Sequence, residues 1–333
     1  MKKNEFVKLI ILIAVVAFAA WRWYNREQNL TQTEFALDTV IEINATAKGI
    51  DLKSILDSTF YLIEKYENDF SFYADGGLIS RINSSGSTDF SMNKDLSEIF
   101  SYARELYQET DSLYDITIGA LTELWDFDKK QIPSKTQIKK AQAVMGLKNI
   151  RFNRKELYRP VGYKFNLGSL AKGYIIDKAV DFMKKNRVKS AIINAGGDIR
   201  IFGQDKPVRV GIQNPRGERN EIVDVLCLTN LSIVTSGDYE RYFIKDGIRY
   251  HHILNPETGF PARNAVSATV IADSALEADA LSTAIFLLDP ARAIQLIEKR
   301  DGVEAVIYYL NGKKLEKILS NGMNKYLEVK NVK

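Results

Sequence analysis

The start of the chain carries one uninterrupted apolar run, residues 9–21, with lysines before it and Arg22 after it. The run is shorter than the about 20 residues that span a bilayer, but apolar and aromatic residues on both sides extend it. Ala17-Phe18-Ala19 also has the small-x-small form of a cleavage site. We therefore expect residues 1–29 to be an N-terminal signal-anchor or a cleaved signal peptide, with a buried core helix as the alternative.

Either segment would place the rest of the chain on the periplasmic, extracytoplasmic side of the inner (cytoplasmic) membrane. Residues 30–333 contain no Pro/Ser-rich linker, repeat or low-complexity tract. We expect them to form a single catalytic domain.

The first half of this region mixes helical and strand-like periods. Apolar spacing predicts a strand at 39–44, helices at 51–66, 96–106 and 136–145, and a hairpin with arms at 150–152 and 157–160. Gly146 is the expected stop of the third helix. Residues 126–134 are expected to form a surface connection.

The second half is richer in strands. We predict a strand at 164–167, a helix at 170–185, strands at 191–194 and 199–203, further strands between 208 and 270, and a helix at 274–288. No regular βαβ alternation persists. The fold class is therefore α+β, with mixed or antiparallel sheets and packed helices, rather than a doubly wound sheet.

The amino-acid composition excludes some classes of function. The 46 Lys+Arg and 42 Asp+Glu residues leave a formal net charge of only +4 on 333 residues. This balance gives no basic stripe of the kind that nucleic-acid binders use, so we expect no nucleic-acid partner. A single cysteine excludes cysteine-cluster metal sites. Any metal must be bound by oxygen atoms or by the two histidines.

The helix at 274–288 contains a carboxylate among apolar residues. Asp279 and Thr283 lie about 40° apart on one helical face, and the apolar residues around them predict that the helix is buried. A buried carboxylate needs a cation or several donors. A carboxylate and a hydroxyl suit Mg²⁺; a structural Asp that accepts backbone hydrogen bonds is the alternative.

Other segments could bind or react with an anion. The turn at 166–173 leads into a helix N-terminus, where free N–H groups and Lys172 favour phosphate, although a plain strand-to-helix turn has the same pattern. His251 and His252 are adjacent on a predicted strand, so at most one can face a given site, and a purely structural role is the alternative. The Gly-Asp strand ends at 194–198 and 235–238 are weaker signals.

Together and in order, these segments resemble the ApbE-type flavin transferases (FAD:protein FMN transferases). The matching segments are 71–73 with 78–83, 114–119 with 124–125, 166–173, 194–198, 236–243, 252–259 and 278–284. The resemblance covers about residues 35–310 and implies the fold of that family. Two positions depart from its pattern: Asn166 stands where the family usually has Asp, and Leu254-Asn255 replaces Ile-Asp.

The resemblance implies Mg²⁺-dependent transfer of the FMN half of FAD to a threonine or serine of a target flavoprotein, with release of AMP. It implies metal ligands at Asp279, Thr283 and the main-chain oxygen of Ser169, and His252 as the base. Contacts with FAD are implied at the following positions: Tyr73, Leu113, Tyr114, Asp115, Asn166, Ser169, Lys172 and Ile253.

The partners implied are FAD and a target protein, a membrane redox subunit being the expected one. Two alternatives remain from the residues. One is a periplasmic FAD pyrophosphatase that gives FMN and AMP, because the same metal site serves both reactions. The other is a non-catalytic FAD-binding protein.

Overall fold

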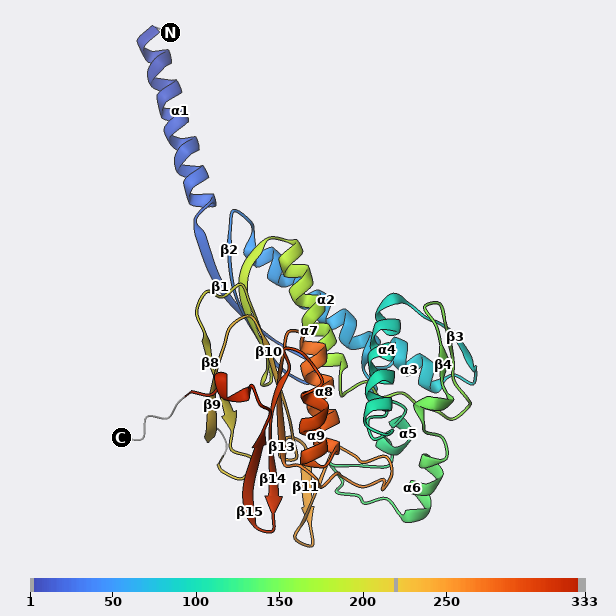
Figure 1. The fold of residues 1–333 in the computed structure, drawn as a ribbon. Coiled ribbons are helices and arrows are strands. Elements are labelled where there is room, and N and C mark those ends of the chain that lie inside the picture. Colours follow the sequence, from blue (N-terminus) through green and yellow to red (C-terminus); the bar gives the residue numbers. More distant parts are fainter. Residues whose placement is uncertain (1–2, 219–220, 329–333) are drawn as a thin grey trace, which may run out of the picture.

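The computed structural model describes residues 3–218 and 221–328. Its centre is an eight-stranded sheet in which every neighbouring pair is antiparallel. In spatial order the strands are β1 (Glu27–Ala36), β2 (Thr39–Lys48), β6 (Val188–Ala195), β7 (Asp198–Phe202), β10 (Ser232–Gly237), β13 (Ser267–Ala272), β14 (Glu304–Asn311) and β15 (Lys314–Leu319). Figure 1 shows this sheet beside a layer of helices.

Helices cover one face of the sheet, and a hairpin covers the other. The helices are α2 (Leu52–Phe70), α7 (Ala171–Lys185), α8 (Ala275–Leu287) and α9 (Pro290–Ile297). Alternation along β13 separates the two faces, since Val270 packs in the helical core and Ile271 in the second cluster. The hairpin of β8 (Val208–Gln213) and β9 (Ile222–Leu228) contributes to that second cluster.

A second lobe lies beside the helical layer in Figure 1. It contains α3 (Leu78–Ser84), α4 (Lys94–Glu109), α5 (Gly119–Thr122), α6 (Lys135–Gln142), the short helix η1 (Leu147–Asn149), and a small sheet of β3 (Asp89–Ser91), β5 (Glu156–Tyr158) and β4 (Arg151–Phe152). The hairpin of β11 (Tyr242–Lys245) and β12 (Ile248–His251) packs against α5 and α6 through a third apolar cluster. The short helix η2 (Met323–Lys325) packs near β14.

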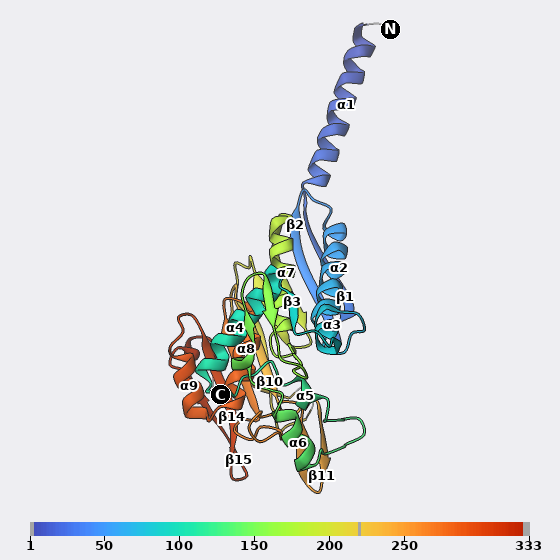
Figure 2. The ribbon, with the colours of Figure 1, turned by 90° about the vertical axis from the view of Figure 1, so that its right-hand side faces the viewer.

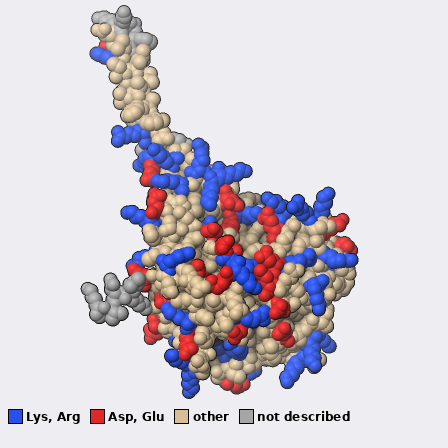
Figure 3. Space-filling model, in the orientation of Figure 1, with Lys and Arg blue, Asp and Glu red and all other residues tan. Residues whose placement is uncertain are grey.

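Helix α1 (Lys3–Tyr24) extends away from the body of the molecule in both ribbon views (Figures 1 and 2). Figure 3 shows that its middle is uncharged and that basic side chains gather at its base. Among the described residues, no helix combines the length and the apolar character that crossing a membrane requires. The signal-anchor or signal-peptide assignment stays a prediction.

The α+β fold class is confirmed. The predicted elements at 39–44, 96–106 and 191–194 lie within β2, α4 and β6, and those at 51–66 and 274–288 match α2 and α8 apart from the capping residues 51, 274 and 288. The predicted strand at 164–167 is wrong. Lys164 forms only an isolated bridge with Ile118, and the amide of Phe165 donates to the side chain of Asn83. Because side chains engage the backbone here, no sheet ladder forms.

Candidate functional site

Asp279 lies in the interior, on the side of α8 that faces α7. Asp279 is only 5% exposed, and its Oδ2 accepts a hydrogen bond from the amide of Gly173 at 2.8 Å. The helices approach this closely because residue 173 has no side chain: a Cβ there would lie 2.2 Å from the carbonyl oxygen of Ala275. Burial and the nearby carboxylate of Asp198 raise the pKa of Asp279 to about 7.

Lys172 forms an ion pair with Asp198, at 2.6 Å between Nζ and Oδ2. Asp198 begins β7, directly after the tight turn from β6, so the turn brings its carboxylate to the start of α7. Burial disfavours the charged lysine, but the carboxylates of Asp198 and Asp279 outweigh this and raise the pKa of Lys172. Lys172 therefore stays positively charged beside two buried acids.

Thr283 lies one helical turn after Asp279 and is half-buried. Its Oγ1 is 3.2 Å from Oγ of Ser236, at the end of β10, and Ser236 also contacts Ser282 at 2.8 Å. The predicted pairing of an acid and a hydroxyl on one face of a buried helix is thus present. We call Lys172, Asp198, Ser236, Asp279 and Thr283 the Asp279 group.

Ser169 and Tyr114 lie beside this group. The Tyr114 hydroxyl donates to the carbonyl oxygen of Ser169 at 3.3 Å and accepts from its Oγ at 2.8 Å. Burial raises the pKa of Tyr114 well above its ordinary value, and the charge of Asp279 acts in the same direction. The phenol thus stays protonated and holds the turn that leads into α7.

The donor chemistry fits the predicted magnesium ion. The described residues contain no group of three or more His, Cys, Asp or Glu side chains arranged for a metal. The carboxylate of Asp279, the hydroxyl of Thr283 and the carbonyl of Ser169 are nevertheless all oxygen ligands. Mg²⁺ is typically bound by one or two carboxylates together with water and substrate phosphates, so a single carboxylate is compatible with it.

The two histidines differ in exposure, but β12 ends at His251, so His252 follows the strand rather than lying on it as predicted. His251 is 1% exposed; its Nε2 lies 2.8 Å from the carbonyl oxygen of Ala262, and its Nδ1 accepts from the amide of Ile253 at 3.3 Å. His252 is solvent-exposed, and its Nδ1 lies 3.3 Å from the carbonyl oxygen of Arg241. Both nitrogens of His251 are therefore engaged, whereas the Nε2 of His252 has no hydrogen-bond partner among the described residues.

His252 is accessible to solvent, yet the protein packed around it lowers its pKa to about 4. The positive charges of Arg241 and Lys172 act in the same direction. The ring is consequently neutral near pH 7. The influence of Lys172 also shows that His252 lies near the Asp279 group.

Asn166 and Asp115, two of the predicted FAD contacts, form hydrogen bonds within the protein. Asn166 Nδ2 donates to Thr122 at 3.2 Å, and its Oδ1 accepts from the amide of Gly168 at 2.9 Å. Asp115 Oδ1 accepts from the amide and hydroxyl of Thr117 at 2.8 and 2.6 Å, and burial raises the pKa of Asp115. Both side chains shape turns that lead to the site.

Three other predicted contacts lie outside the Asp279 group. Ile253 is buried in the main apolar cluster, and Leu113 packs against that cluster. Tyr73 lies between α2 and α3, is 65% exposed, and meets the ring of Phe72 edge-on at 5.0 Å. Their roles in binding FAD remain predictions.

Two tertiary contacts near the site were not predicted. Trp125 Nε1 donates to the carbonyl oxygen of Gly259 at 3.1 Å, tying the end of α5 to the turn after His252. Arg216 forms a two-pronged pair with Asp238 at 2.8 and 2.6 Å. The sequence marked 235–238 only as a strand end, and no local pattern identifies a partner 22 residues away.

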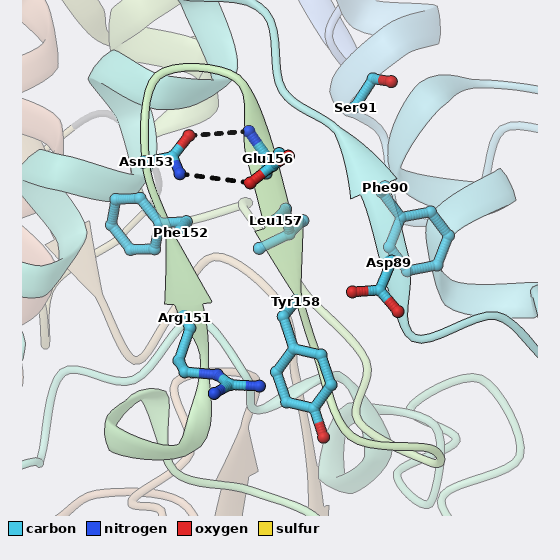
Figure 4. Close-up of a pocket in the computed structure, with 9 residues that line it drawn as sticks. All are labelled: Asp89, Phe90, Ser91, Arg151, Phe152, Asn153, Glu156, Leu157 and Tyr158. Atoms are coloured by element: carbon cyan, nitrogen blue, oxygen red, sulfur yellow. Dashed lines mark hydrogen bonds between the residues drawn. The ribbon is translucent and has the colours of Figure 1, made fainter.

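A hollow of about 570 Å³ lies elsewhere, along β3, β4 and β5 (Figure 4). Arg151 lies over the ring of Tyr158 at 4.3 Å, and the amide of Glu156 donates to Asn153 at 3.0 Å. None of its lining residues belongs to the Asp279 group. The reactive groups therefore gather at α7 and α8 rather than in this hollow.

The fold and the site together define an α+β enzyme, and known proteins of the same kind are transferases. The model of the ApbE family matches residues 37–307, and the chain belongs to that family. The resemblance seen in the sequence is thereby confirmed.

Curated relatives share this assignment across most of their length. The FAD:protein FMN transferase of Treponema pallidum is 27% identical over 309 residues, covering 85% of each chain. That of Escherichia coli strain K12 is 29% identical over 303 residues, again covering 85% of each.

Solved structures of ApbE proteins have the same fold as this chain. The ApbE protein of Thermotoga maritima superposes with a TM-score of 0.81 and 32% identity, covering 90% of this chain and all of its own. The flavin transferase ApbE of Vibrio cholerae gives the same TM-score at 23% identity, covering 91% of this chain and all of its own. The latter match supports the fold alone.

Proposed function

We propose that this protein transfers the FMN moiety of FAD to a threonine or serine hydroxyl of a target protein and releases AMP, in a Mg²⁺-dependent reaction. The observation that carries the proposal is the Asp279 group, in which a buried acid and a hydroxyl one turn apart lie beside a charged lysine, together with the neutral, accessible His252 nearby. Membership of the ApbE family and the names of its curated relatives support it.

Each residue has a chemical task. Lys172 and the N–H groups at the start of α7 attract the pyrophosphate of FAD. Asp279, Thr283 and the carbonyl of Ser169 would hold Mg²⁺, which neutralises pyrophosphate charge when it is bound. The buried position of Asp279, with its pKa near 7, gives a strong preference for a neighbouring cation.

His252 is the proposed base. Its Nδ1 faces a carbonyl oxygen and must therefore carry the ring proton, which leaves the lone pair on Nε2. Nε2 takes the proton of the acceptor hydroxyl as the hydroxyl oxygen bonds to the FMN phosphorus. The bond from that phosphorus to the bridging oxygen breaks, and AMP leaves with the electron pair.

Mass spectrometry tests this function. Purified protein is incubated with FAD, Mg²⁺ and a candidate membrane redox subunit that bears the acceptor threonine, with the Thr→Val form of that subunit as control. An FMN adduct on the threonine form alone, together with AMP, is expected. Free FMN and AMP without an adduct would instead favour the pyrophosphatase, and unchanged FAD would favour a non-catalytic FAD-binding protein.

We also propose that residues 1–29 attach or direct the protein to the inner membrane, with the catalytic domain on the periplasmic side. The apolar run at 9–21, preceded by lysines, supports this. Protease treatment of spheroplasts should digest the catalytic domain without lysis. Protection until lysis would contradict the proposed orientation.

A further inference from the structure

The β11–β12 hairpin is held firmly at its base. Asp246 and Gly247 link the strands with φ values of 52° and 74°, the two left-handed residues of a tight type I′ turn. On the inner face, the rings of Phe243 and Tyr250 stack at 5.2 Å, and Tyr250 lies 5.9 Å from Trp125. The hairpin is therefore a fixed projection rather than a loose loop.

Its outer side exposes apolar surface. Tyr242 and Ile244, which alternation places on the face opposite Phe243 and Tyr250, are 41% and 55% exposed. Within the described residues, β11 and β12 pair only with each other, so the outer backbone edges of the hairpin belong to no larger sheet. Exposed apolar side chains on such a pair are typical of a site that binds an extended chain.

Positive charge surrounds this apolar surface. Arg241 and Lys245 are exposed on β11 and just before it, and Arg263 is exposed nearby. Arg249 lies over the ring of Tyr242 at 3.9 Å, and Arg241 over the ring of Phe127 at 5.5 Å. Within residues 240–251 the only acids are Glu240 and Asp246, and Arg249 also lies 3.9 Å from the buried Asp238. The surface therefore complements an acidic partner.

The hairpin also adjoins the proposed base. The backbone carbonyl of Arg241 accepts a hydrogen bond from the amide of His252 at 3.1 Å and lies 3.3 Å from its Nδ1. A chain bound along β11 is thus next to the ring that would take the proton of the acceptor hydroxyl.

We propose that the outer surface of the β11–β12 hairpin binds the target polypeptide, as an extended segment in which apolar and acidic residues flank the acceptor threonine or serine. This inference rests on the proposed function. A lipid surface fits less well, because the hairpin lies at the end of the molecule opposite α1 in both ribbon views (Figures 1 and 2).

Peptide binding to the full chain tests the proposal without requiring turnover. The probe is a fluorescent peptide with one threonine among valines and aspartates, and the matched peptide has lysines in place of the aspartates. We expect the acidic peptide to bind more tightly by about tenfold, as charge complementarity of this kind allows. Equal affinity for both peptides would overturn the proposal.

Two variants locate the binding surface. Ile244→Asp and Lys245→Glu should each weaken binding of the acidic peptide by about tenfold. Leu310→Asp and Lys313→Glu are the matched controls, because residues 310 and 313 are exposed on the separate β14–β15 hairpin; both should bind as the unchanged protein does. Loss of affinity in the controls, or none in the hairpin variants, would contradict the assignment.

FAD binding and FMN transfer separate this inference from the proposed function. Ile244→Asp and Lys245→Glu should bind FAD with unchanged affinity while losing peptide affinity. Peptide binding without any transfer of FMN would refute the function and leave the docking surface standing. Hairpin-dependent binding of anionic vesicles, or hairpin-dependent self-association, in place of peptide binding would assign the surface to lipid or to a second copy and overturn the proposal.

Discussion

Two buried carboxylates lie on opposite sides of the central sheet and differ in their partners. Asp224, on the side of β8 and β9, accepts from the hydroxyl of Tyr308 and from Nζ of Lys317, the latter at 2.5 Å. Asp279, on the helical side, accepts from the amide of Gly173, while the nearest lysine pairs with Asp198. The fold itself supplies Asp224 with a hydrogen-bond donor and a cation. The buried charge of Asp279 would be stabilised further by a bound cation.

The same contrast separates the histidines. His251 has both ring nitrogens engaged by the backbone, which makes it part of the fold. His252 keeps one nitrogen for another molecule. Polar groups near the site thus divide into those whose hydrogen-bonding groups the protein occupies and those with a group left for a ligand, and only the second kind indicates function.

The largest expected effect is at Asp279. Asp279→Asn keeps the acceptor for Gly173 but loses the charge, so Mg²⁺-dependent turnover of FAD should fall about a thousandfold. Asp224→Asn should retain turnover but lower the free energy of unfolding by about 2 kcal/mol, because it weakens two bonds to a charged oxygen. Steady-state kinetics and urea unfolding of both variants measure these effects.

Asp279→Ala should abolish the Mg²⁺-dependent rate as well. Turnover at the unchanged rate in either Asp279 variant would remove the metal assignment. Equal losses of activity at Asp224 and Asp279 would break the comparison, since one of these acids is expected to be purely structural.

The second effect is at the histidines. His252→Ala should still bind FAD but transfer FMN about a hundredfold more slowly, because the proton acceptor is lost. His251→Ala should affect the rate less and the stability more, since it leaves the carbonyl of Ala262 without its donor. FAD titration and single-turnover transfer to the target distinguish the two. Equal losses of rate would undermine the choice of His252.

The sequence was sufficient for the elements whose evidence is local. Apolar residues on every side of 275–287 required a buried helix, and they placed Asp279 and Thr283 inside it. The adjacent histidines differ in exposure, although only His251 lies on a strand, so alternation along a strand is not the cause. One local signal was overlooked: Asp246-Gly247 between alternating apolar residues is the strongest pattern for a two-residue hairpin.

What could not be predicted depends on contacts between distant segments. Lys172 and Asp198 pair because the β6–β7 turn meets the start of α7, and no periodicity encodes that meeting. The strand predicted at 164–167 failed for the same reason, since the side chain of Asn83 takes the amide that a neighbouring strand would need. Local pattern specifies elements, but the partner of each polar group is set by packing.

A smaller effect is expected at the buried ion pair. Asp198→Asn removes a negative charge beside Lys172, so FAD should bind more tightly. Because Lys172 loses the ion pair that positions it, kcat should fall about tenfold. Glu27→Gln is the control, because Glu27 pairs with Lys189 at an exposed site where such pairs contribute little. Weaker FAD binding with unchanged kcat would show that Asp198 does not position Lys172.

The last effect concerns stability rather than the rate of the reaction, namely the response of stability to pH. Burial lowers the pKa of His251 to about 4, against an ordinary value of 6.5. Between these values the unfolded chain takes up a proton that the folded chain refuses, so stability is complete above pH 6.5 and falls as the pH drops toward 4. From pH 7.5 to pH 5 this group should cost about 2 kcal/mol. His251→Gln should remove that portion of the acid sensitivity in urea unfolding, whereas His252→Gln should remove less because solvent reaches its ring. A larger effect at His252 would mean that His252, rather than His251, is the histidine built into the fold.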